Sequence, residues 1–410
     1  MKKIECCRIC GNKELYPIIN IGNHALTGIF PKTKQETVSK GILELVKCSD
    51  KGCGLLQINH SFDTNEMYGN KYGYRSGLNK SMVNHLGRIV KKILSIVEIG
   101  KNDIIVDIGS NDGTLLSFYP NDYINLVGID PTSEKFKKYY EKRVNIITDF
   151  FTKETYKKSY KERKTKVITS IAMFYDMENP LNFMKDVYEV LDDNGVWIFE
   201  QSYAPFMIDN ISYDTICHEH LEYYCLKQIK YMTDKIGFKI IDMEFNDVNG
   251  GSFKMTVAKN NSKYNECTSL IRDILLREKK YDTQETLKEF ATNTEKHKKD
   301  FLKLLTDLKE DGKKVLGYGA STKGNVILQY CQINTDLIPY IAEVNEDKFG
   351  SYTPETLIPI ISEKEAKEMK PDYFIVFPWH FKNNIIEREK DFLINGGKLI
   401  FPLPKIEIIG

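Results

Sequence analysis

The sequence predicts an α/β protein built in three parts: a small cysteine-rich module at the N-terminus, a central Rossmann-like unit, and a second, smaller Rossmann-like unit at the C-terminus. Three observations predict this architecture. Two closely spaced cysteine pairs lie within the first 53 residues. An apolar strand followed by a glycine turn occurs at 103–116, and the same pattern returns at 313–325. After both turns, apolar strands alternate with helical segments, which is typical of a parallel sheet covered by helices.

The size and composition of the chain limit the classes of protein to which it can belong. Its 410 residues are enough for roughly two or three domains, which we place at 1–70, 71–260 and 261–410. The 58 basic and 57 acidic side chains give a formal net charge of +1, which disfavours binding to a nucleic-acid backbone. No apolar run approaches the roughly 18 residues of a membrane span, and the N-terminal residues do not form a secretory signal. We therefore expect a cytoplasmic monomer without a nucleic-acid or membrane partner.

The clustered cysteines of the N-terminal module predict a structural zinc site. One pair has the C-x2-C spacing of a zinc knuckle and the other has a looser C-x4-C spacing, and four thiolates can surround one Zn²⁺ as a tetrahedron. Gly11 and Gly54 follow the two pairs and suit the tight turn that directs backbone N–H groups at sulfur. Cys6 is an alternative ligand to its neighbour, and unliganded reduced cysteines are the alternative to a metal site. The expected ligands are Cys7, Cys10, Cys48 and Cys53.

The first glycine turn of the central unit indicates a nucleotide-like ligand. An apolar strand ends in Asp107, and Gly109 and Gly113 then allow a ligand to approach the backbone before the start of a helix. The next strand ends in Asp130, whose carboxylate can accept hydrogen bonds from both ribose hydroxyls. A dinucleotide-binding loop would carry its middle glycine where this chain has Asn111. The pattern looks like the S-adenosylmethionine (SAM) site of the class I methyltransferases.

The strands of the central unit match the seven-strand count of the methyltransferase sheet, and a helix over 80–98 precedes them. Further cofactor contacts are expected where strands end. Asp149, followed by Phe150, is placed after the third strand to meet the adenine amine, and Ala172 and Met173 follow the fourth strand to pack against the cofactor. Ordinary core or capping roles are the alternative for each residue. The predicted strands span 103–107, 126–129, 145–147, 166–171, 195–199, 238–243 and 252–257.

A histidine-rich segment after the fifth strand is the candidate for catalysis. His218 and His220 bracket Glu219, and histidine is the side chain best suited to proton transfer near neutral pH. The H-x-H spacing can also bind a metal, but no third ligand follows at helical spacing. A structural hydrogen-bonding cluster is a further alternative. Acid–base chemistry is the interpretation that we favour.

With these motifs, the chain resembles the nucleotide-sugar C-methyltransferases, which place methyl branches on deoxysugars. The resemblance covers nearly all 410 residues and implies a zinc-binding module, a class I methyltransferase domain that binds SAM, and a C-terminal domain of its own. The motifs occur in one order along the chain, which makes the resemblance specific. They are the four N-terminal cysteines, the glycine turn Val106–Gly113, the segment Asp214–Tyr224 and the second glycine turn Gly317–Gly324.

The resemblance also implies roles for individual residues. The family's general base falls on His220, supported by Glu219, and removes a proton from the carbon beside a keto group so that the enolate attacks the SAM methyl. The family's linker tyrosine falls on Tyr74. Two positions depart from the 3-C-methyltransferases: Cys217 stands where they have a tyrosine, and Asp176 stands where they have a histidine. Both positions lie near the expected substrate, so the resemblance leaves open the sugar and the carbon that is methylated.

The C-terminal third begins with charged segments over 262–312, which we interpret as solvated helices that link two domains. The second glycine turn then places backbone N–H groups and polar side chains at a helix start, which suits a phosphate of the nucleotide. Two glycines ahead of the last methyltransferase strand border the expected sugar pocket, and a tryptophan can stack on a ring or belong to the core. The substrate-binding candidates are His218, Gly250, Gly251, Gly319, Ser321, Lys323 and Trp379.

These features predict a SAM-dependent C-methyltransferase that acts on a nucleotide-linked keto-deoxysugar, with Zn²⁺ as a structural ion. An O-methyltransferase on the same class of substrate would use the same base on a hydroxyl group. A nucleotide-sugar-binding protein without turnover, or a nucleic-acid-modifying protein with a zinc ribbon, is the alternative from another class. The histidine cluster argues against the passive binder, and the near-zero net charge argues against the nucleic-acid enzyme.

Overall fold

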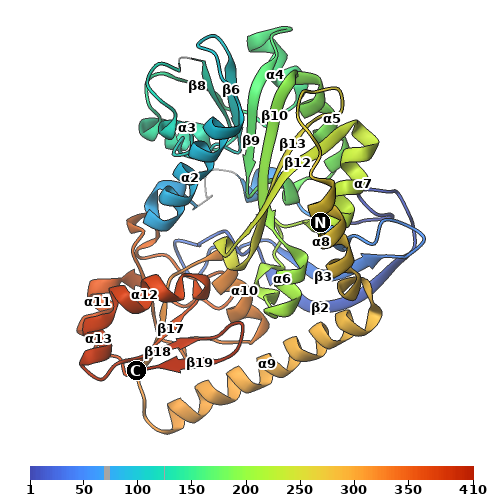
Figure 1. The fold of residues 1–410 in the computed structure, drawn as a ribbon. Helices are drawn as coiled ribbons and strands as arrows, with labels where there is room; N and C mark the ends of the chain where they lie inside the picture. The colour runs from blue at the N-terminus through green and yellow to red at the C-terminus, as the bar shows by residue number, and fades with distance from the viewer. Residues whose placement is uncertain (69–73, 124) are drawn as a thin grey trace.

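A computed structural model of the chain describes residues 1–68, 74–123 and 125–410 (Figure 1). The expected boundary between the first two parts, at residues 70 and 71, lies outside the described residues. Three sheets form the body of the protein, with four, seven and six strands. Within the described ranges, none of the helices combines the length and the apolar character that crossing a bilayer requires.

The N-terminal module is a four-stranded antiparallel sheet. Apolar side chains alternate along its two long strands, so Ile19, Ile21, Leu43 and Leu45 are buried in one core. One edge strand comes from far along the chain and ties the module to the histidine segment. In pairing order the strands are β11 (Glu222–Tyr223), β4 (Leu56–Ile58), β3 (Lys40–Cys48) and β2 (Leu15–Ala25), while β1 (Lys2–Lys3) pairs with β5 (His60–Ser61) and α1 (Thr64–Met67) follows.

The central unit is a seven-stranded sheet in which all seven predicted strands are confirmed. The last strand in the sequence is inserted antiparallel between two earlier strands, and the remaining neighbours pair parallel. In pairing order the strands are β12 (Phe238–Asn246), β13 (Ser252–Lys259), β10 (Leu191–Ser202), β9 (Thr165–Ile171), β6 (Ile104–Ile108), β7 (Leu126–Ile129) and β8 (Val144–Ile147). The strand order reverses next to β6, which is where open α/β sheets bind ligands.

The helices of the central unit are mostly those that the sequence predicts. The helix ahead of the first strand is confirmed as α2 (Lys80–Ile96), with its apolar face buried. The helix expected directly after Gly113 is wrong, because only a 3-10 turn, η2 (Leu116–Phe118), forms there. The Asp112 carboxylate accepts hydrogen bonds from the N–H and the hydroxyl of Thr114, and this local bonding competes with a helical start. Other helices are α3 (Ser133–Phe136), α4 (Lys153–Tyr160), α5 (Pro180–Val190), α6 (Ala204–Asp209) and α7 (Leu226–Ile236).

The C-terminal part is the second Rossmann-like unit that the sequence predicts. In pairing order its strands are β16 (Ile360–Ser362), β15 (Ile341–Glu343), β14 (Val315–Tyr318), β17 (Tyr373–Val376), β18 (Lys398–Phe401) and β19 (Glu407–Ile409). Its helices include α10 (Thr322–Tyr330), α11 (Glu363–Glu368), α12 (Lys382–Arg388) and α13 (Lys390–Ile394). All strands are parallel except β19 at the edge. The strand order reverses next to β14, the strand that the second glycine turn follows.

Two helices, α8 (Thr268–Glu278) and α9 (Gln284–Glu310), connect the two Rossmann-like units. The expectation of solvated linking helices is wrong for α9, because one of its faces is buried. Figure 1 shows this long helix passing beside β2 and reaching the C-terminal sheet. Its apolar side chains share one core with both sheets, so the N-terminal module and the C-terminal unit pack together through it. These side chains are Leu287, Phe290, Phe301, Leu305 and Leu308.

Candidate active site and zinc site

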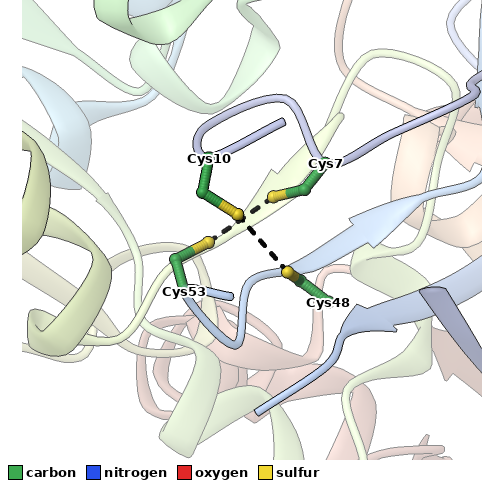
Figure 2. Close-up of side chains that lie close together, drawn as sticks. All are labelled: Cys7, Cys10, Cys48 and Cys53. Carbon is green, nitrogen blue, oxygen red and sulfur yellow. Dashed lines mark hydrogen bonds between the residues drawn. The ribbon is translucent and has the colours of Figure 1, made fainter. Parts of the chain in front are cut away.

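The four cysteines of the N-terminal module come together as the sequence predicts. Their Sγ atoms lie within 4.8 Å of one another, and the Cys7–Cys53 and Cys10–Cys48 pairs are each 3.5 Å apart (Figure 2). A tetrahedral zinc ion with Zn–S bonds of about 2.3 Å separates its sulfur ligands by about 3.8 Å, so the cluster has the size of a zinc site. The glycine after each pair has a φ of +73°, the left-handed geometry that the tight turn requires. The protein therefore binds a structural Zn²⁺ through these thiolates.

The zinc module also holds the end of the histidine segment, Asp214–Tyr224. β11 pairs with β4, and the N–H of Ile58 donates to the carbonyl of Leu221 at 2.9 Å. The N–H of Leu221 donates in turn to the carbonyl of Tyr175, which comes shortly after β9. Arg8 lies 3.8 Å from the buried carboxylate of Glu222. The end of the histidine segment is thus attached both to the zinc module and to the central sheet.

The first glycine turn has the conformation that a ligand-binding loop requires. Gly109 and Gly113 have φ angles of +73° and +77°, and Asn111 between them lies in the same left-handed region at +52°. A Cβ atom on Gly113 would stand 2.7 Å from the ring of Tyr140, so a side chain there would force a shift. The N–H of Asn111 donates to Asp130 Oδ2 at 2.8 Å. The acid at the end of the next strand therefore closes the turn.

Two acids beside this turn are oriented by hydrogen bonds from the protein. Asp107 is buried at the end of β6 and accepts a 2.6 Å bond from the hydroxyl of Thr169, and burial raises its pKa to about 7. Asp130 Oδ1 accepts the N–H and the hydroxyl of Thr132, both at 2.6 Å. A carboxylate has about four lone-pair sites, so these bonds are compatible with the ribose contact that we expect of Asp130.

Tyr74 lies beside the same turn through its backbone. Its carbonyl accepts from Asn111 Nδ2 at 3.2 Å, and the N–H of Ser76 donates to Asn111 Oδ1 at 2.9 Å. The N–H of Gly77 donates to Asp112 at 2.9 Å. The side chain of Tyr74 is 48% exposed. This segment is therefore attached to the first glycine turn, and the catalytic role of Tyr74 stays a prediction.

The other expected cofactor residues lie where strands of the central sheet end. Asp149 and Phe150 are exposed after β8, and the carboxylate of Asp149 accepts the N–H of Phe150. Ala172 has a φ of +55° and donates its N–H to the carbonyl of Glu200 at 2.7 Å. Met173 packs over the first glycine of the turn, because a Cβ on that glycine would stand 3.0 Å from its Cγ. Their contacts with SAM stay predictions.

The orientation of the His220 ring is determined by its neighbours. Nδ1 lies 3.0 Å from the carbonyl oxygen of Thr215, and this contact requires the proton on Nδ1, so Nε2 of the neutral ring carries the lone pair. The ring packs on Tyr175 with centroids 4.3 Å apart. Burial, and then the positive charge of Lys323, lower the pKa of His220 to about 3. The ring is therefore neutral at neutral pH and can accept a proton at Nε2.

Two acids and a thiol adjoin this base candidate. Cys217 is fully buried beside the carboxyl group of Glu219, and the hydroxyl of Thr27 is 3.5 Å from the same group. Asp176 accepts a 2.7 Å hydrogen bond from the hydroxyl of Tyr68. Burial raises the pKa of both acids, and the negative charge of Glu219 adds to the effect at Asp176. The structure thus brings Cys217, Glu219 and Asp176 together in a setting where the acids hold a proton more readily than ordinary carboxylates.

The C-terminal unit contributes side chains to the same region. Lys323, on the first turn of α10, donates to the carbonyl of Asn249, and its ammonium lies 3.9 Å from the position of a Cβ on Gly250. The indole N–H of Trp379 donates to Asp214 Oδ2 at 2.7 Å. Side chains of the two Rossmann-like units therefore meet next to the histidine segment.

The glycine turn of the C-terminal unit is held by internal contacts. Ser321 caps α10 by accepting the N–H of Gly324 at 3.0 Å. Gly319 has a φ of +86°, and a Cβ there would stand 2.6 Å from Pro378. The hydroxyl of Ser321 can still donate its own proton, because the cap uses only an oxygen lone pair. Phosphate binding by this turn stays a prediction.

Two of the expected substrate residues are enclosed by packing. His218 is fully buried, packs edge-on against Phe62 with centroids 4.7 Å apart, and approaches the carbonyl of Gly41 on β3 at 3.4 Å. A Cβ on Gly251 would stand 2.6 Å from the ring of Phe206 on α6. His218 therefore faces the N-terminal sheet at Gly41 of β3 and also borders Phe62, which follows β5.

Several polar side chains that lie at these sites in the structure have no role assigned from the sequence. Asp214 accepts the indole N–H described above, and Tyr68 donates to Asp176. His85 on α2 and Glu200 at the end of β10 form a buried pair with Nε2 and Oε1 2.6 Å apart. The position of Asp214 at the start of a recognised motif was a usable signal. No local pattern connects His85 with Glu200, because they lie on separate elements.

Three family models match the chain one after the other. A model described as a zinc binding domain matches residues 7–68, and a model of a methyltransferase domain matches residues 80–243. The third, described as a C-methyltransferase C-terminal domain, matches residues 247–404. The four cysteines fall in the first match, the first glycine turn and the histidine segment in the second, and the second glycine turn in the third.

Individual proteins are similar to the chain over different shares of its length. The chain is 26% identical to the C-methyltransferase NovU of Streptomyces niveus over 414 residues, which cover 100% of this chain and 98% of that protein. A chain from the complex of the Haloferax volcanii Trm112 methyltransferase activator with a methyltransferase is 12% identical, covers 45% of this chain and 94% of its own length, and has a TM-score of 0.36. A methyltransferase from Bacillus halodurans is 13% identical, with coverage of 43% and 100% and a TM-score of 0.34. The three consecutive family matches and the full-length relative support a SAM-dependent C-methyltransferase with a zinc-binding domain, a methyltransferase domain and a C-terminal domain.

Proposed function

We propose that the protein methylates a carbon next to the keto group of a nucleotide-linked keto-deoxysugar, with His220 as the general base. The observation that carries the proposal is the orientation of this ring, because the carbonyl of Thr215 holds the proton on Nδ1 and leaves Nε2 to accept one. Lys323 and Trp379 of the C-terminal unit extend to the same region. A substrate held by that unit would therefore lie next to the base.

The two Rossmann-like units suit two different nucleotides. The turn Gly109–Gly113 follows β6, where the order of the seven-stranded sheet reverses, and would hold SAM. The turn after β14 has the corresponding position in the six-stranded sheet, and the backbone N–H groups at the start of α10 support a phosphate there. This assignment gives the ranges 1–70, 71–260 and 261–410 separate roles, as zinc module, cofactor domain and nucleotide-sugar domain.

The proposed reaction is carried by the side chains around His220. Nε2 removes a proton from the carbon beside the ketone, and the C–H electrons move to form an enolate. SAM supplies the methyl group as an electrophile for this carbon. Glu219 and Asp176, whose raised pKa values favour the protonated carboxyl group, would donate hydrogen bonds to oxygen atoms of the sugar. The buried Cys217 would shape the same pocket without taking part in proton transfer.

Mass spectrometry of the protein with SAM and a panel of nucleotide-linked 4-keto-deoxysugars tests this proposal. We expect a product heavier by one methylene, formed together with S-adenosylhomocysteine. His220→Asn should abolish turnover and leave SAM affinity within a few-fold of the wild type, because asparagine is polar but offers no basic nitrogen. Near-normal turnover by this variant would contradict the assignment of the base.

Solvent exchange separates the proposed reaction from its alternatives. In D2O, with S-adenosylhomocysteine in place of SAM, enolate formation replaces the proton next to the keto group with deuterium. An O-methyltransferase leaves this carbon unlabelled, although it produces a methylated sugar. A protein that binds the nucleotide sugars and gives neither exchange nor product would be a binder without turnover.

A further inference from the structure

Lys323 places a cation of the C-terminal unit at the proposed methylation site. It belongs to the first turn of α10, and this helix contacts the 3-10 turn η5 (Tyr213–Thr215), whose last carbonyl orients His220. The ammonium reaches across to the methyltransferase unit and donates to the carbonyl of Asn249. The lysine that the sequence suggested for phosphate binding thus extends toward the base.

The positive charge of Lys323 is only partly compensated. Within the described residues, the carbonyl of Asn249 is the one hydrogen-bond acceptor of its ammonium, which has three N–H donors. Asp214 attracts the ammonium through space, but its Oδ2 already accepts the indole N–H of Trp379. Oδ1 of Asp214 is buried and has no hydrogen-bond partner in the described part of the chain. A partly buried cation with spare donors favours a further negatively charged oxygen beside it.

We propose that Lys323 is a catalytic residue that stabilises the enolate oxygen formed when His220 removes the proton, an inference that rests on the proposed function. The proton moves from the carbon to Nε2, the C–H electron pair forms the C=C bond, and the carbonyl π electrons move to oxygen. An N–H of Lys323 donates to this oxygen. When the carbon bonds to the methyl group, the electrons return, the ketone forms again, and the lysine is still protonated.

This arrangement also fits a base whose pKa is lowered by burial and, in addition, by a nearby cation. The charge of Lys323 disfavours the imidazolium form of His220 before the enolate forms. Once the enolate forms, its negative charge lies beside both cations and offsets their mutual repulsion. The interaction is thus stronger in the transition state than in the ground state, which is the condition for accelerating the step. If Lys323 instead paired with a phosphate of the substrate, that interaction would be equally strong in the ground state and in the transition state and would not accelerate the step.

Substitutions of Lys323 test the proposal through deuterium exchange at saturating keto sugar, with S-adenosylhomocysteine in D2O. Loss of a donor to a developing oxyanion slows a reaction about 100- to 1000-fold, so Lys323→Met and Lys323→Gln should lose at least about 100-fold in exchange rate. Lys323→Arg keeps the cation and should lose less than about tenfold. Titrations with dTDP, GDP and CDP should show that the nucleotide bound by the wild type keeps its affinity within about threefold in all variants.

Lys367→Met is the matched control, because it removes another cation of the C-terminal unit, one that pairs with Glu389 at 2.8 Å. It should exchange deuterium at the wild-type rate, and SAM affinity checks the fold of every variant. Exchange by Lys323→Met within about tenfold of the wild type would overturn the proposal. If nucleotide affinity falls instead, the lysine is a phosphate ligand. If the wild type introduces deuterium into none of the keto sugars of the panel, the proposed function is overturned, and this inference with it.

Discussion

A backbone carbonyl determines which nitrogen of His220 carries the lone pair, and burial and a neighbouring cation favour the neutral ring. Asp176 obtains its chemistry in the same way, because burial and the charge of Glu219 raise its pKa while Tyr68 donates to one of its oxygens. The residue types alone would titrate near their ordinary values. At the scale of single residues, function therefore depends on contacts as much as on identity.

A single glycine substitution tests the cofactor loop. Gly113→Ala should lower the free energy of unfolding by about 1–3 kcal/mol, because alanine is strained at a φ of +77° and its Cβ would meet the ring of Tyr140. The displaced turn should also weaken SAM binding by more than about tenfold, measured by calorimetry. Gly312→Ala is the matched control, since Gly312 has a φ of +71° with nothing within 4 Å of its Cβ position. Gly312→Ala should lower the free energy of unfolding and leave the affinity for SAM unchanged. If Gly113→Ala and Gly312→Ala bind SAM equally well, the proposed role of the first glycine turn in SAM binding is contradicted.

Two strands connect the zinc site with the histidine segment. β4 comes directly after the last pair of zinc ligands, and it pairs with β11, which comes directly after His220 and Leu221. The first glycine turn, the proposed SAM site, follows a strand of the seven-stranded sheet instead. At the scale of elements, the metal therefore supports the histidine segment more directly than it supports the first glycine turn.

Removal of zinc should consequently lower turnover before it lowers SAM affinity. A chelator titration, followed by metal analysis, turnover and calorimetry with SAM, measures the two effects separately. Cys10→Ser should reproduce the chelated state, because it removes one of the four clustered thiolates. Cys6→Ser is the control, since Cys6 lies outside the cluster, and it should retain zinc and activity. Parallel loss of SAM binding and turnover would show that the metal supports the whole fold.

The three parts of the molecule share their cores. The zinc-ligating cysteines are packed in one core with the seven-stranded sheet, whereas the apolar side chains of β2 and β3 share another with α9 and the C-terminal sheet. Several histidines lie in these inner regions. Burial lowers the pKa of His24 to about 4 and the pKa of His218 and His220 to about 3, from the ordinary value of 6.5.

These histidines make the stability of the whole chain depend on pH. Between pH 6.5 and about 3 the unfolded chain binds more protons than the folded one, so the contribution is fully present above pH 6.5 and is lost as the pH falls toward 3. We expect His218→Gln to remove one part of this dependence. Below pH 6, the free energy of unfolding of the wild type should fall more steeply than that of the variant, by up to about 1.4 kcal/mol per pH unit.

Urea unfolding of both proteins at several pH values between 5 and 7.5 makes this measurement. Zinc content is followed in parallel, because protonation of the thiolates weakens metal binding at acid pH in both proteins. If the free energy of unfolding falls with pH equally steeply in the wild type and in His218→Gln, then His218 is protonated in the folded chain. This result would contradict its burial between Phe62 and β3.

Local patterns were sufficient for much of the fold and for the outline of the site. Alternating apolar strands and glycine turns predicted both Rossmann-like sheets, and cysteine spacing predicted the zinc ligands. The prediction of a helix directly after Gly113 was wrong because the carboxylate of Asp112 accepts the backbone N–H of Thr114, and this bond competes with a helical start. The burial of one face of α9 was missed because its charged residues outnumber the apolar ones that the two neighbouring sheets cover.

The amino-acid sequence alone thus determined the strands, the turns, the metal ligands and the position of the histidine segment, because periodicity, spacing and residue type are local properties. Only the tertiary structure decided that β11 completes the N-terminal sheet, that His218 faces this sheet, and that Lys323 extends toward His220. Each of these contacts joins segments far apart in the chain. Burial and charge at such contacts set protonation states and hydrogen-bond partners, and these properties have no local signal in the sequence.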